Sequence, residues 1–540
     1  MTPPSYEAPG PGTWEQDSTH FPRPLTPFVS EVFPEGFKRG FKEGTARYGL
    51  LLSHLEPAVI NGFLYNRADG VAPDDEEEIG RRFGAAREAL ASRIWRQDIE
   101  LWDGEYKPDS MRRNQALQDI DVSALDTEGL LAHLAAVRDN AAEMVYRHHK
   151  FTIGSIIPVG LYLSNVMRWT GLDAGEILAP LKGSSPVSLG ALEQLRGLAR
   201  ALEESGMGPE DFNGASAQET LDALADREDA VGEATREFLS SIGLRLAGGY
   251  DIADPCAVEL PEMLLGTIRS ALDPSKDTSH ASTEAEELVR AAVPAAHRER
   301  FDELLGEARL INRLRDERGI FNDNWGTGIA RKAILEAGRR LAASGRIHVA
   351  QSALDATCDE LDGMLRGHPD PSADALAART HRRLHTPAGE APPFIGPEPA
   401  PPPPPDGLPP HVAEMMGAVG VAIGEIFAHG PPPSGPAITG RAVSPGVYTG
   451  TARVIDRPDE SNRIQKGDVL VTGSTSAAFN VVLPLLGAIV TDRGGQLSHA
   501  AIVAREFGIP AVVGTSKATA SIPDGARVRV DGTSGTVELV

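Results

Sequence analysis

The 540-residue sequence contains only two cysteines, Cys256 and Cys358, and neither lies in a CxxC pair. The chain therefore has no disulfide framework and no cysteine-based metal motif. Long uncharged apolar runs are absent as well. The start of the chain, Met1–Thr13, is rich in proline and glycine and lacks the apolar core of a secretory signal. We therefore expect a cytoplasmic protein without a membrane span.

Positive charge is also scarce, because 52 Lys and Arg residues face 76 Asp and Glu residues, for a formal net charge of −24. Nucleic acids and anionic membranes both attract a positive surface, so we expect neither as a partner. The remaining composition, 41% hydrophobic and 24% charged, is typical of a globular protein. The length predicts more than one domain.

Most of the chain carries a helical pattern. From about Glu31 to Gly367 apolar residues recur at spacings of three and four, and the alternation typical of strands is nearly absent. Helix start and stop signals accompany this pattern, for example Ser188 as the N-cap of a helix that ends at Gly206. The sequence predicts a large all-α domain over residues 1–385.

The composition changes twice after His385. Residues 386–436 hold five consecutive prolines at 401–405 and a second proline cluster at 431–436, which predict an extended linker and hinge around one short helix, His411–Phe427. Residues 437–540 then show short β-rich runs separated by glycine and proline, with one clear helix at Ser498–Phe507. This last segment predicts a small α/β domain.

The segment TDRGGQLSHAAIVARE, which contains His499, reads as strand, glycine turn and helix. Gly494 and Gly495 permit a tight turn close to a bulky anion, and Ser498 is a suitable N-cap. His499 then falls in the first helical turn, where backbone N–H groups and the helix dipole favour an anion and disfavour the imidazolium form. Neutral imidazole can attack phosphorus and form a covalent intermediate. A histidine that only caps the helix is the alternative.

The longer string TDRGGQLSHAAIVAREFGIPAVVGT resembles the phosphohistidine motif of the mobile domain of the PEP-utilising enzymes, which include pyruvate phosphate dikinase, PEP synthase and rifampin phosphotransferase. The resemblance covers residues 440–540. It implies a swivelling domain in which His499 is the phosphorylated, catalytic residue. The loop and helix around this histidine would be shaped by Gly494, Gly495, Ser498 and Arg505. Leu497 replaces the threonine of the dikinases that are regulated by phosphorylation, so we do not expect that regulation.

The sequence contains no GxxxxGK[ST] loop, and nothing before His499 resembles the ATP-grasp domain of these enzymes. The order of segments is similar to the last two of the three domains of rifampin phosphotransferase. The resemblance therefore implies that a separate ATP-grasp protein supplies ATP and Mg and phosphorylates His499. We expect no cofactor and no metal bound by this chain alone.

Several stretches of the helical domain resemble, more weakly, the substrate domain of rifampin phosphotransferase-like proteins: GTWEQDSTHFPRPLTPF, GGYD and RKAILEAGRRLAASGRI. The polar candidates for binding a small-molecule substrate or the docked phosphohistidine are His20, Arg23, Arg245, Asp251 and Arg318. Each of these residues could instead tie helices together as a buried hydrogen-bonded pair.

Transfer to an alcohol benefits from a general base, for which His20, His148 and His149 are candidates that the sequence does not rank. His148 and His149 are neighbours on a predicted helix and point about 100° apart. We therefore expect one in the core and the other facing solvent, and no metal pair.

Three hypotheses for function follow. The first is the acceptor half of a split phosphotransferase, which carries phosphate on His499 from the ATP-grasp protein to a small molecule in the helical domain. The second is a ligase or dehydratase that activates a carboxylate or hydroxyl as its phosphate ester. The third is a non-catalytic ligand-binding protein that keeps a relic histidine domain, against which the intact motif argues.

Overall fold

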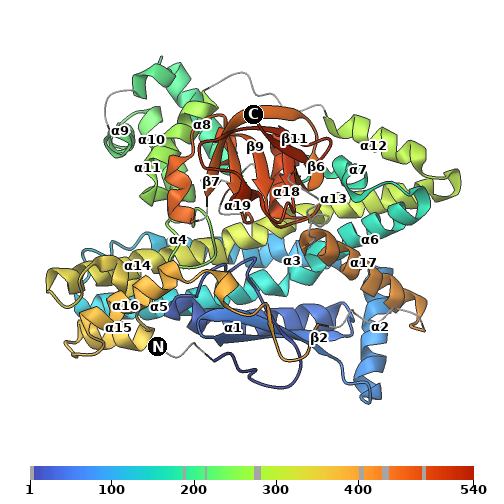
Figure 1. Cartoon of the computed structure of the whole chain (residues 1–540), viewed down its shortest axis with the longest axis horizontal. Helices are drawn as coiled ribbons and strands as arrows, with labels where there is room; N and C mark the ends of the chain where they lie inside the picture. Colours follow the sequence, from blue (N-terminus) through green and yellow to red (C-terminus); the bar gives the residue numbers. More distant parts are fainter. Residues whose placement is uncertain are drawn as a thin grey trace. The chain divides into compact units, whose positions relative to one another are not determined.

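The computed structural model (Figure 1) describes residues 5–185, 190–212, 216–272, 281–399, 407–427, 437–455, 457–476, 479 and 482–540. The N-cap predicted at Ser188 and the proline clusters at 401–405 and 431–436 lie outside these residues. The chain forms two compact units. Unit 1 comprises residues 1–155, 250–253 and 318–416, and unit 2 comprises residues 156–249, 254–317 and 417–540.

Unit 1 is built mainly from helices. Helix α1 (Pro27–Arg47) packs along α5 (Thr127–Lys150), and α14 (Asp323–Ala343) packs on α5 as well. Helix α1 begins where Thr26 accepts a hydrogen bond from Val29 N–H. The further helices of unit 1 are α2 (Glu76–Ser92), α3 (Trp95–Leu101), α4 (Lys107–Gln118), α15 (Cys358–Leu365) and α16 (Ala373–His385).

Unit 1 also contains a four-stranded antiparallel sheet, so the prediction of an all-α domain is wrong for this part of the chain. The strands, in the order β2-β3-β1-β4, are β2 (Leu52–Ile60), β3 (Phe63–Gly70), β1 (Trp14–Gln16) and β4 (Phe394–Ile395). Strands β2 and β3 form a hairpin whose two turn residues, Asn61 and Gly62, both have positive φ. An Asn-Gly turn of this kind matches the twist of a hairpin. Trp14 and Phe63 form part of the apolar core under this sheet.

Three helices cross the boundary between the units: α6 (Thr152–Thr170), α13 (Arg298–Phe321) and α17 (Pro410–Phe427). Helix α17 confirms the short helix predicted from His411.

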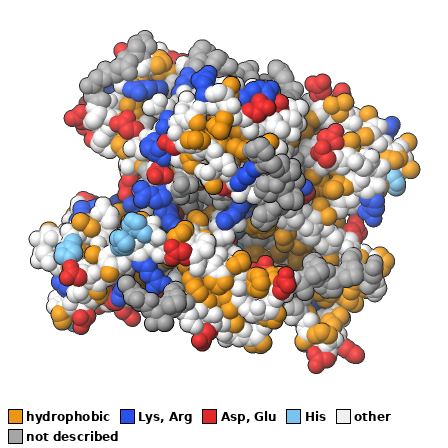
Figure 2. Space-filling view, viewed as in Figure 1, with side chains coloured by type: hydrophobic (Ala, Val, Ile, Leu, Met, Phe, Trp, Pro, Cys, Tyr) orange, Lys and Arg blue, Asp and Glu red, His pale blue; other side chains and the backbone are white. Residues whose placement is uncertain are grey.

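The face drawn in Figure 2 shows acidic and basic side chains interspersed among uncharged ones. Among the described helices, none combines the length and the apolar character that a bilayer span requires.

Unit 2 contains an eight-stranded sheet in the order β5-β12-β11-β7-β8-β9-β10-β6, formed by residues 438–539. The strands are β5 (Ile438–Thr439), β6 (Arg441–Ser444), β7 (Val447–Ile455), β8 (Asp468–Thr472), β9 (Leu486–Thr491), β10 (Ala511–Val513), β11 (Arg527–Asp531) and β12 (Thr536–Leu539). Strands β7 to β10 are parallel neighbours, and α18 (His499–Phe507) connects β9 to β10 and packs on β6, β9 and β10 (Figure 1). This confirms a small α/β sheet domain near the end of the chain.

Besides α18, the helices within unit 2 are α7 (Ala174–Leu178), α8 (Gly190–Glu204), α9 (Ala217–Ala225), α10 (Ala230–Ile242), α11 (Pro261–Ala271), α12 (Ala281–Ala292) and α19 (Ala518–Ser521). One apolar cluster joins buried residues of α8 to α11 with residues of the sheet domain, among them Leu264, Leu485 and Leu486. Ser270 on α11 also donates a hydrogen bond to the carbonyl of Pro484 at 2.8 Å. The boundaries at residues 385 and 436 stay predictions, because a mobile domain can pack against its neighbour in one state.

Candidate active site

His499 is the first residue of α18, as the sequence predicts. Ser498 precedes it with extended backbone (φ −66°, ψ 158°), and its Oγ accepts a hydrogen bond from Ala501 N–H at 3.3 Å. Gly494, in the loop before the helix, has φ +110°, and a Cβ at this position would lie 2.8 Å from Ser498 Cβ. Glycine is therefore required for the loop to approach the helix cap so closely. The predicted N-cap and helix start are confirmed.

Arg505 fastens this loop to the helix. One guanidinium nitrogen donates to the carbonyl of Gln496 at 2.6 Å, and the other donates to Gln496 Oε1 at 3.2 Å and to the carbonyl of Val443 at 3.3 Å. Burial lowers the pKa of Arg505 to about 10, so the side chain keeps its positive charge at neutral pH. Arg505 thus contributes both the shape of the loop and a positive charge on the helix that carries His499.

The ring of His499 contacts the loop that follows β8. Its Nδ1 lies 3.0 Å from Thr475 Oγ1. Burial lowers the pKa of His499 to about 4, Asp316 opposes this effect, and Arg315 adds to it. The lowered pKa keeps the ring neutral at neutral pH, and its largest cause is burial rather than the helix position.

The charged groups of α13 near His499 were not anticipated from the sequence. Asp316 is buried and accepts a hydrogen bond from Ser185 Oγ at 2.8 Å. Glu506, the residue after Arg505, accepts from Gly183 N–H with both carboxylate oxygens, at 3.0 and 2.8 Å. Burial raises the pKa of Glu506 to about 7. The surroundings of the histidine therefore contain charges of both signs, and one carboxyl group that titrates near neutrality.

Unit 1 brings two of the predicted substrate residues, His20 and Arg318, into one polar cluster with the candidate base His148. Arg318 donates from Nη1 to the carbonyl of His148 at 3.2 Å and to Thr152 Oγ1 at 2.8 Å. His148 Nδ1 lies 2.7 Å from Asp323 Oδ1 at the start of α14. Asp323 is the residue of this cluster that the sequence reasoning missed.

The rings of His148 and His149 stack with centroids 4.5 Å apart and planes 27° apart. The expectation that one ring would face solvent is therefore wrong. Both side chains are largely buried, because α14 covers His148 through Asp323 and phenylalanines of α1 cover His149. The rotation of 100° per residue places the Cβ atoms apart, but the side-chain torsions bring the rings back together.

The three other predicted substrate residues are divided between the two units. Asp251 is buried in unit 1, where its carboxylate accepts hydrogen bonds from Thr26 N–H and Ala253 N–H at 2.9 and 2.8 Å. Arg23 is partly buried in the same unit. Arg245 belongs to unit 2, where burial lowers its pKa to about 10. Roles in substrate binding stay predictions for these three residues, and the contacts of Asp251 fit the structural alternative.

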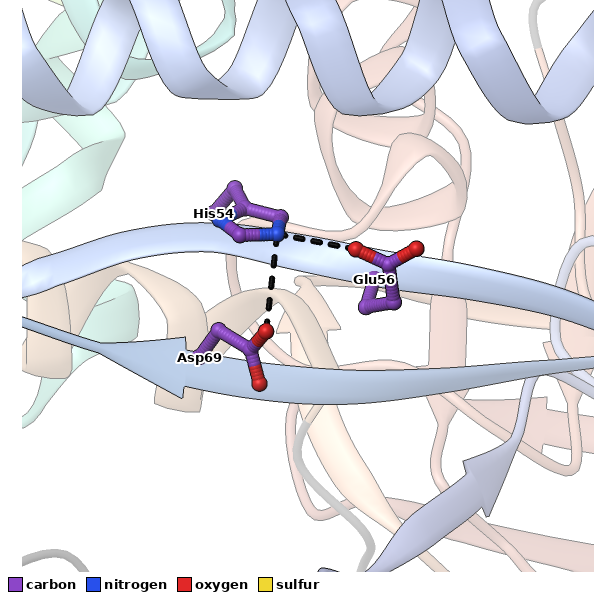
Figure 3. Close-up of side chains that lie close together, drawn as sticks. All are labelled: His54, Glu56 and Asp69. Atoms are coloured by element: carbon purple, nitrogen blue, oxygen red, sulfur yellow. Dashed lines mark hydrogen bonds and ion pairs between the residues drawn. The ribbon is translucent and has the colours of Figure 1, made fainter. Parts of the chain in front are cut away.

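A second cluster of titratable side chains lies on the hairpin of unit 1 (Figure 3). His54 Nε2 lies 2.9 Å from Glu56 Oε2 and 3.5 Å from Asp69 Oδ2. Such a set could hold a cation, but each carboxylate already pairs with a basic side chain. Lys38 Nζ lies 2.7 Å from Glu56, and Arg67 Nε lies 2.6 Å from Asp69. The cluster is an ion-pair network on a strand surface, and its charge is balanced by protein groups.

Comparison with known proteins finds two segments of the chain that match known domain families. Residues 464–535 match the family profile of the PEP-utilising enzyme mobile domain, and residues 148–320 match that of the rifampicin phosphotransferase fourth domain. The first match contains His499 and the second contains Asp316 and Arg318. The chain is therefore similar to phosphotransferases of the PEP-utilising class.

Within that class the chain resembles rifampicin phosphotransferase. It is 30% identical over 331 residues to a rifampicin phosphotransferase of a Streptomyces species, which covers 57% of this chain and 34% of the relative. It is 44% identical over 104 residues to the rifampicin phosphotransferase of Bacillus cereus, and 48% identical over 101 residues to the PEP synthase of Aeropyrum pernix. Those two alignments cover 19% and 18% of this chain and 12% of each relative. The chain thus spans about a third or less of the length of these curated relatives.

Proposed function

We propose that the chain is the acceptor half of a phosphotransferase. In this proposal a separate ATP-grasp protein, with ATP and Mg, phosphorylates His499, and the swivelling domain of residues 437–540 passes the phosphoryl group to a small molecule bound by the helical part. The match of residues 148–320 to a domain of rifampicin phosphotransferase supports a small-molecule acceptor. The activity, the acceptor and the partner are all parts of the proposal.

The observation that carries the proposal is the state of the His499 ring. It is neutral at neutral pH because of its burial, and Thr475 engages Nδ1. We therefore place the phosphoryl group on Nε2, which attacks phosphorus while the bond from phosphorus to the leaving group of the donor breaks. The first turn of α18 offers backbone N–H groups and the positive end of the helix dipole to the phosphoryl oxygens.

The direct test is phosphorylation of the purified full chain. Radiolabelled ATP is added together with an ATP-grasp protein encoded beside it, and potassium phosphoramidate serves in parallel as a chemical donor. The label should be stable to alkali and labile to acid, and it should be lost in His499→Ala. His411→Ala, which removes a histidine of α17, is the control and should keep the label.

Two results would contradict the proposal. Labelling that persists in His499→Ala would place the chemistry on another residue. Failure of both donors to label the wild-type chain would show that the ring cannot take up phosphate. A stable phosphorylated product supports transfer, whereas release of inorganic phosphate from an activated intermediate would favour a ligase or dehydratase.

A further inference from the structure

Three histidines of unit 1 could accept the proton of an acceptor hydroxyl, and their contacts separate them. His149 is committed to packing. Its Nδ1 donates to the carbonyl of Val145 at 2.8 Å, and its ring lies among Phe33, Phe37 and Phe41 with centroid distances of 4.7 to 5.7 Å. A ring that packs against three aromatic side chains contributes to the core and is poorly placed to contact a polar substrate.

His20 is paired with a neighbouring carboxylate. Its Nδ1 lies 2.9 Å from both carboxylate oxygens of Asp17, whose Oδ1 also accepts from the His20 backbone N–H at 3.1 Å. Burial alone would lower the pKa of His20, but Asp17 outweighs burial and raises it above the ordinary value. A raised pKa favours the charged ring, which suits the binding of an anion better than the removal of a proton.

His148 has the opposite character. Its Nδ1 lies 2.7 Å from Asp323 Oδ1, and burial raises the pKa of Asp323 only to about 6, so the carboxylate is ionised at neutral pH. Burial, with the positive charges of Arg318 and His20, lowers the pKa of His148 well below its ordinary value. The neutral ring therefore donates its Nδ1 proton to Asp323, and this tautomer leaves a basic lone pair on Nε2.

Three residues around the end of α13 lie close to His148 or Asp323 in space or in sequence. Asn322, at the break between α13 and α14, is 0% exposed, and neither polar atom of its side chain has a hydrogen-bond partner among the described residues. Leaving such an amide unsatisfied costs roughly 1–3 kcal/mol. Gly319 carries no side chain beside the ring, since a Cβ there would lie 3.6 Å from His148 Cε1. Arg318 places a guanidinium in the same cluster.

From this geometry we propose that His148 is the general base of an acceptor site for an alcohol, and that Asp323 is its positioning residue. The inference rests on the proposed function. The acceptor oxygen forms a bond to phosphorus while its proton passes to His148 Nε2. The phosphorus–nitrogen bond of phospho-His499 breaks, and its electron pair returns to the His499 ring. Asp323 stabilises the imidazolium that forms on His148.

The experiment measures the uptake of phosphate by His499 separately from the transfer of phosphate to an acceptor. The full chain is phosphorylated with phosphoramidate, freed of donor, and mixed with rifampicin or with the small-molecule fraction of a bacterial lysate. Phosphohistidine loss and phosphorylated product are followed by mass spectrometry. We expect His148→Gln to load normally and to transfer about 10²- to 10⁴-fold more slowly, the range typical of a removed acid–base group. Asp323→Asn should slow transfer in the same way.

His348→Gln is the matched control, because His348 Nε2 also lies 2.7 Å from an aspartate, Asp374, but on an exposed surface. It should load and transfer like the wild type. Normal transfer by His148→Gln would overturn the inference and leave the proposed function standing. If the wild-type chain loads phosphate and transfers it to no acceptor, the proposed function fails at its second step.

The tautomer and charge of the His148 ring, measured by NMR, test the inference whether or not transfer to an acceptor is observed. Histidine labelled with ¹⁵N, with the His148 signals assigned by their loss in His148→Gln, reports tautomer and charge between pH 6 and 8. We expect a neutral ring with its proton on Nδ1 across this range, and an altered ring in Asp323→Asn. A ring that is protonated at pH 7, or that carries its proton on Nε2, would overturn the assignment.

Discussion

The loop before His499 depends on glycine at position 494, and Gly494→Ala tests this dependence. Its φ of +110° is a conformation that costs a side chain about 1–3 kcal/mol. The new Cβ would also lie 2.8 Å from Ser498 Cβ and 2.9 Å from Ser498 Oγ, so the helix cap must move. Loss of an N-cap costs about 1 kcal/mol. We expect α18 to lose about 2–4 kcal/mol of local stability.

Native-state hydrogen exchange measures this loss, because it reports the opening free energy of individual amides. A loss of 2–4 kcal/mol corresponds to a fall of roughly 30- to 1,000-fold in the protection of the α18 amides, since about 1.4 kcal/mol is a factor of ten. Gly525→Ala is the control, because Gly525 has φ +79° and nothing within 4 Å of the added Cβ. Protection of α18 within threefold of wild type in Gly494→Ala would refute the reasoning.

Three further predictions follow from the contacts. Thr475→Val removes the hydroxyl that orients His499 and should slow its labelling by phosphoramidate by about tenfold, whereas equal labelling would remove Thr475 from the site. The folded-state pKa of Glu506 is raised from 4.5 to about 7, so this group's contribution to stability is present below pH 4.5 and is lost as pH rises through 7. Glu506→Gln should therefore lose less of its melting temperature between pH 5 and 8 than the wild type, and equal losses would contradict the shift. Arg383→Ala leaves the buried Asp355 carboxylate without its ion pair and should destabilise unit 1 by about 3–5 kcal/mol in calorimetry, whereas an unchanged transition would show that the pair contributes nothing.

Local signals in the sequence were sufficient for several elements. Ser498 before His499 predicted the cap and start of α18, and the periodicity after Pro410 predicted α17. The glycine and β-rich texture after residue 437 predicted the sheet domain. In each case the deciding residues lie within about one helical turn or one strand of each other, so no tertiary information was needed.

Contacts between distant residues could not be predicted in the same way. His148 and Asp323 are 175 residues apart, and nothing in either local sequence indicates the 2.7 Å contact between them. The hairpin of β2 and β3 was missed although Asn61-Gly62 is a strong turn signal, because β2 contains Pro57 and Glu56 and does not alternate cleanly. Thr475 was also missed, although a run of small polar residues after a strand could have pointed to it.

The apolar contact between α11 and the sheet domain limits what can move on its own. Leu264, Leu485 and Leu486 are all buried in one cluster, and Ser270 adds a hydrogen bond to Pro484. Exposing three leucines to water costs roughly 5–9 kcal/mol, which would leave fewer than about one molecule in a thousand detached at any moment. A phosphoryl shuttle made only of residues 437–540 would therefore spend nearly all its time docked. If His499 moves toward a donor or an acceptor, movement of helices α8 to α11 together with the sheet domain avoids the free-energy cost of exposing these leucines.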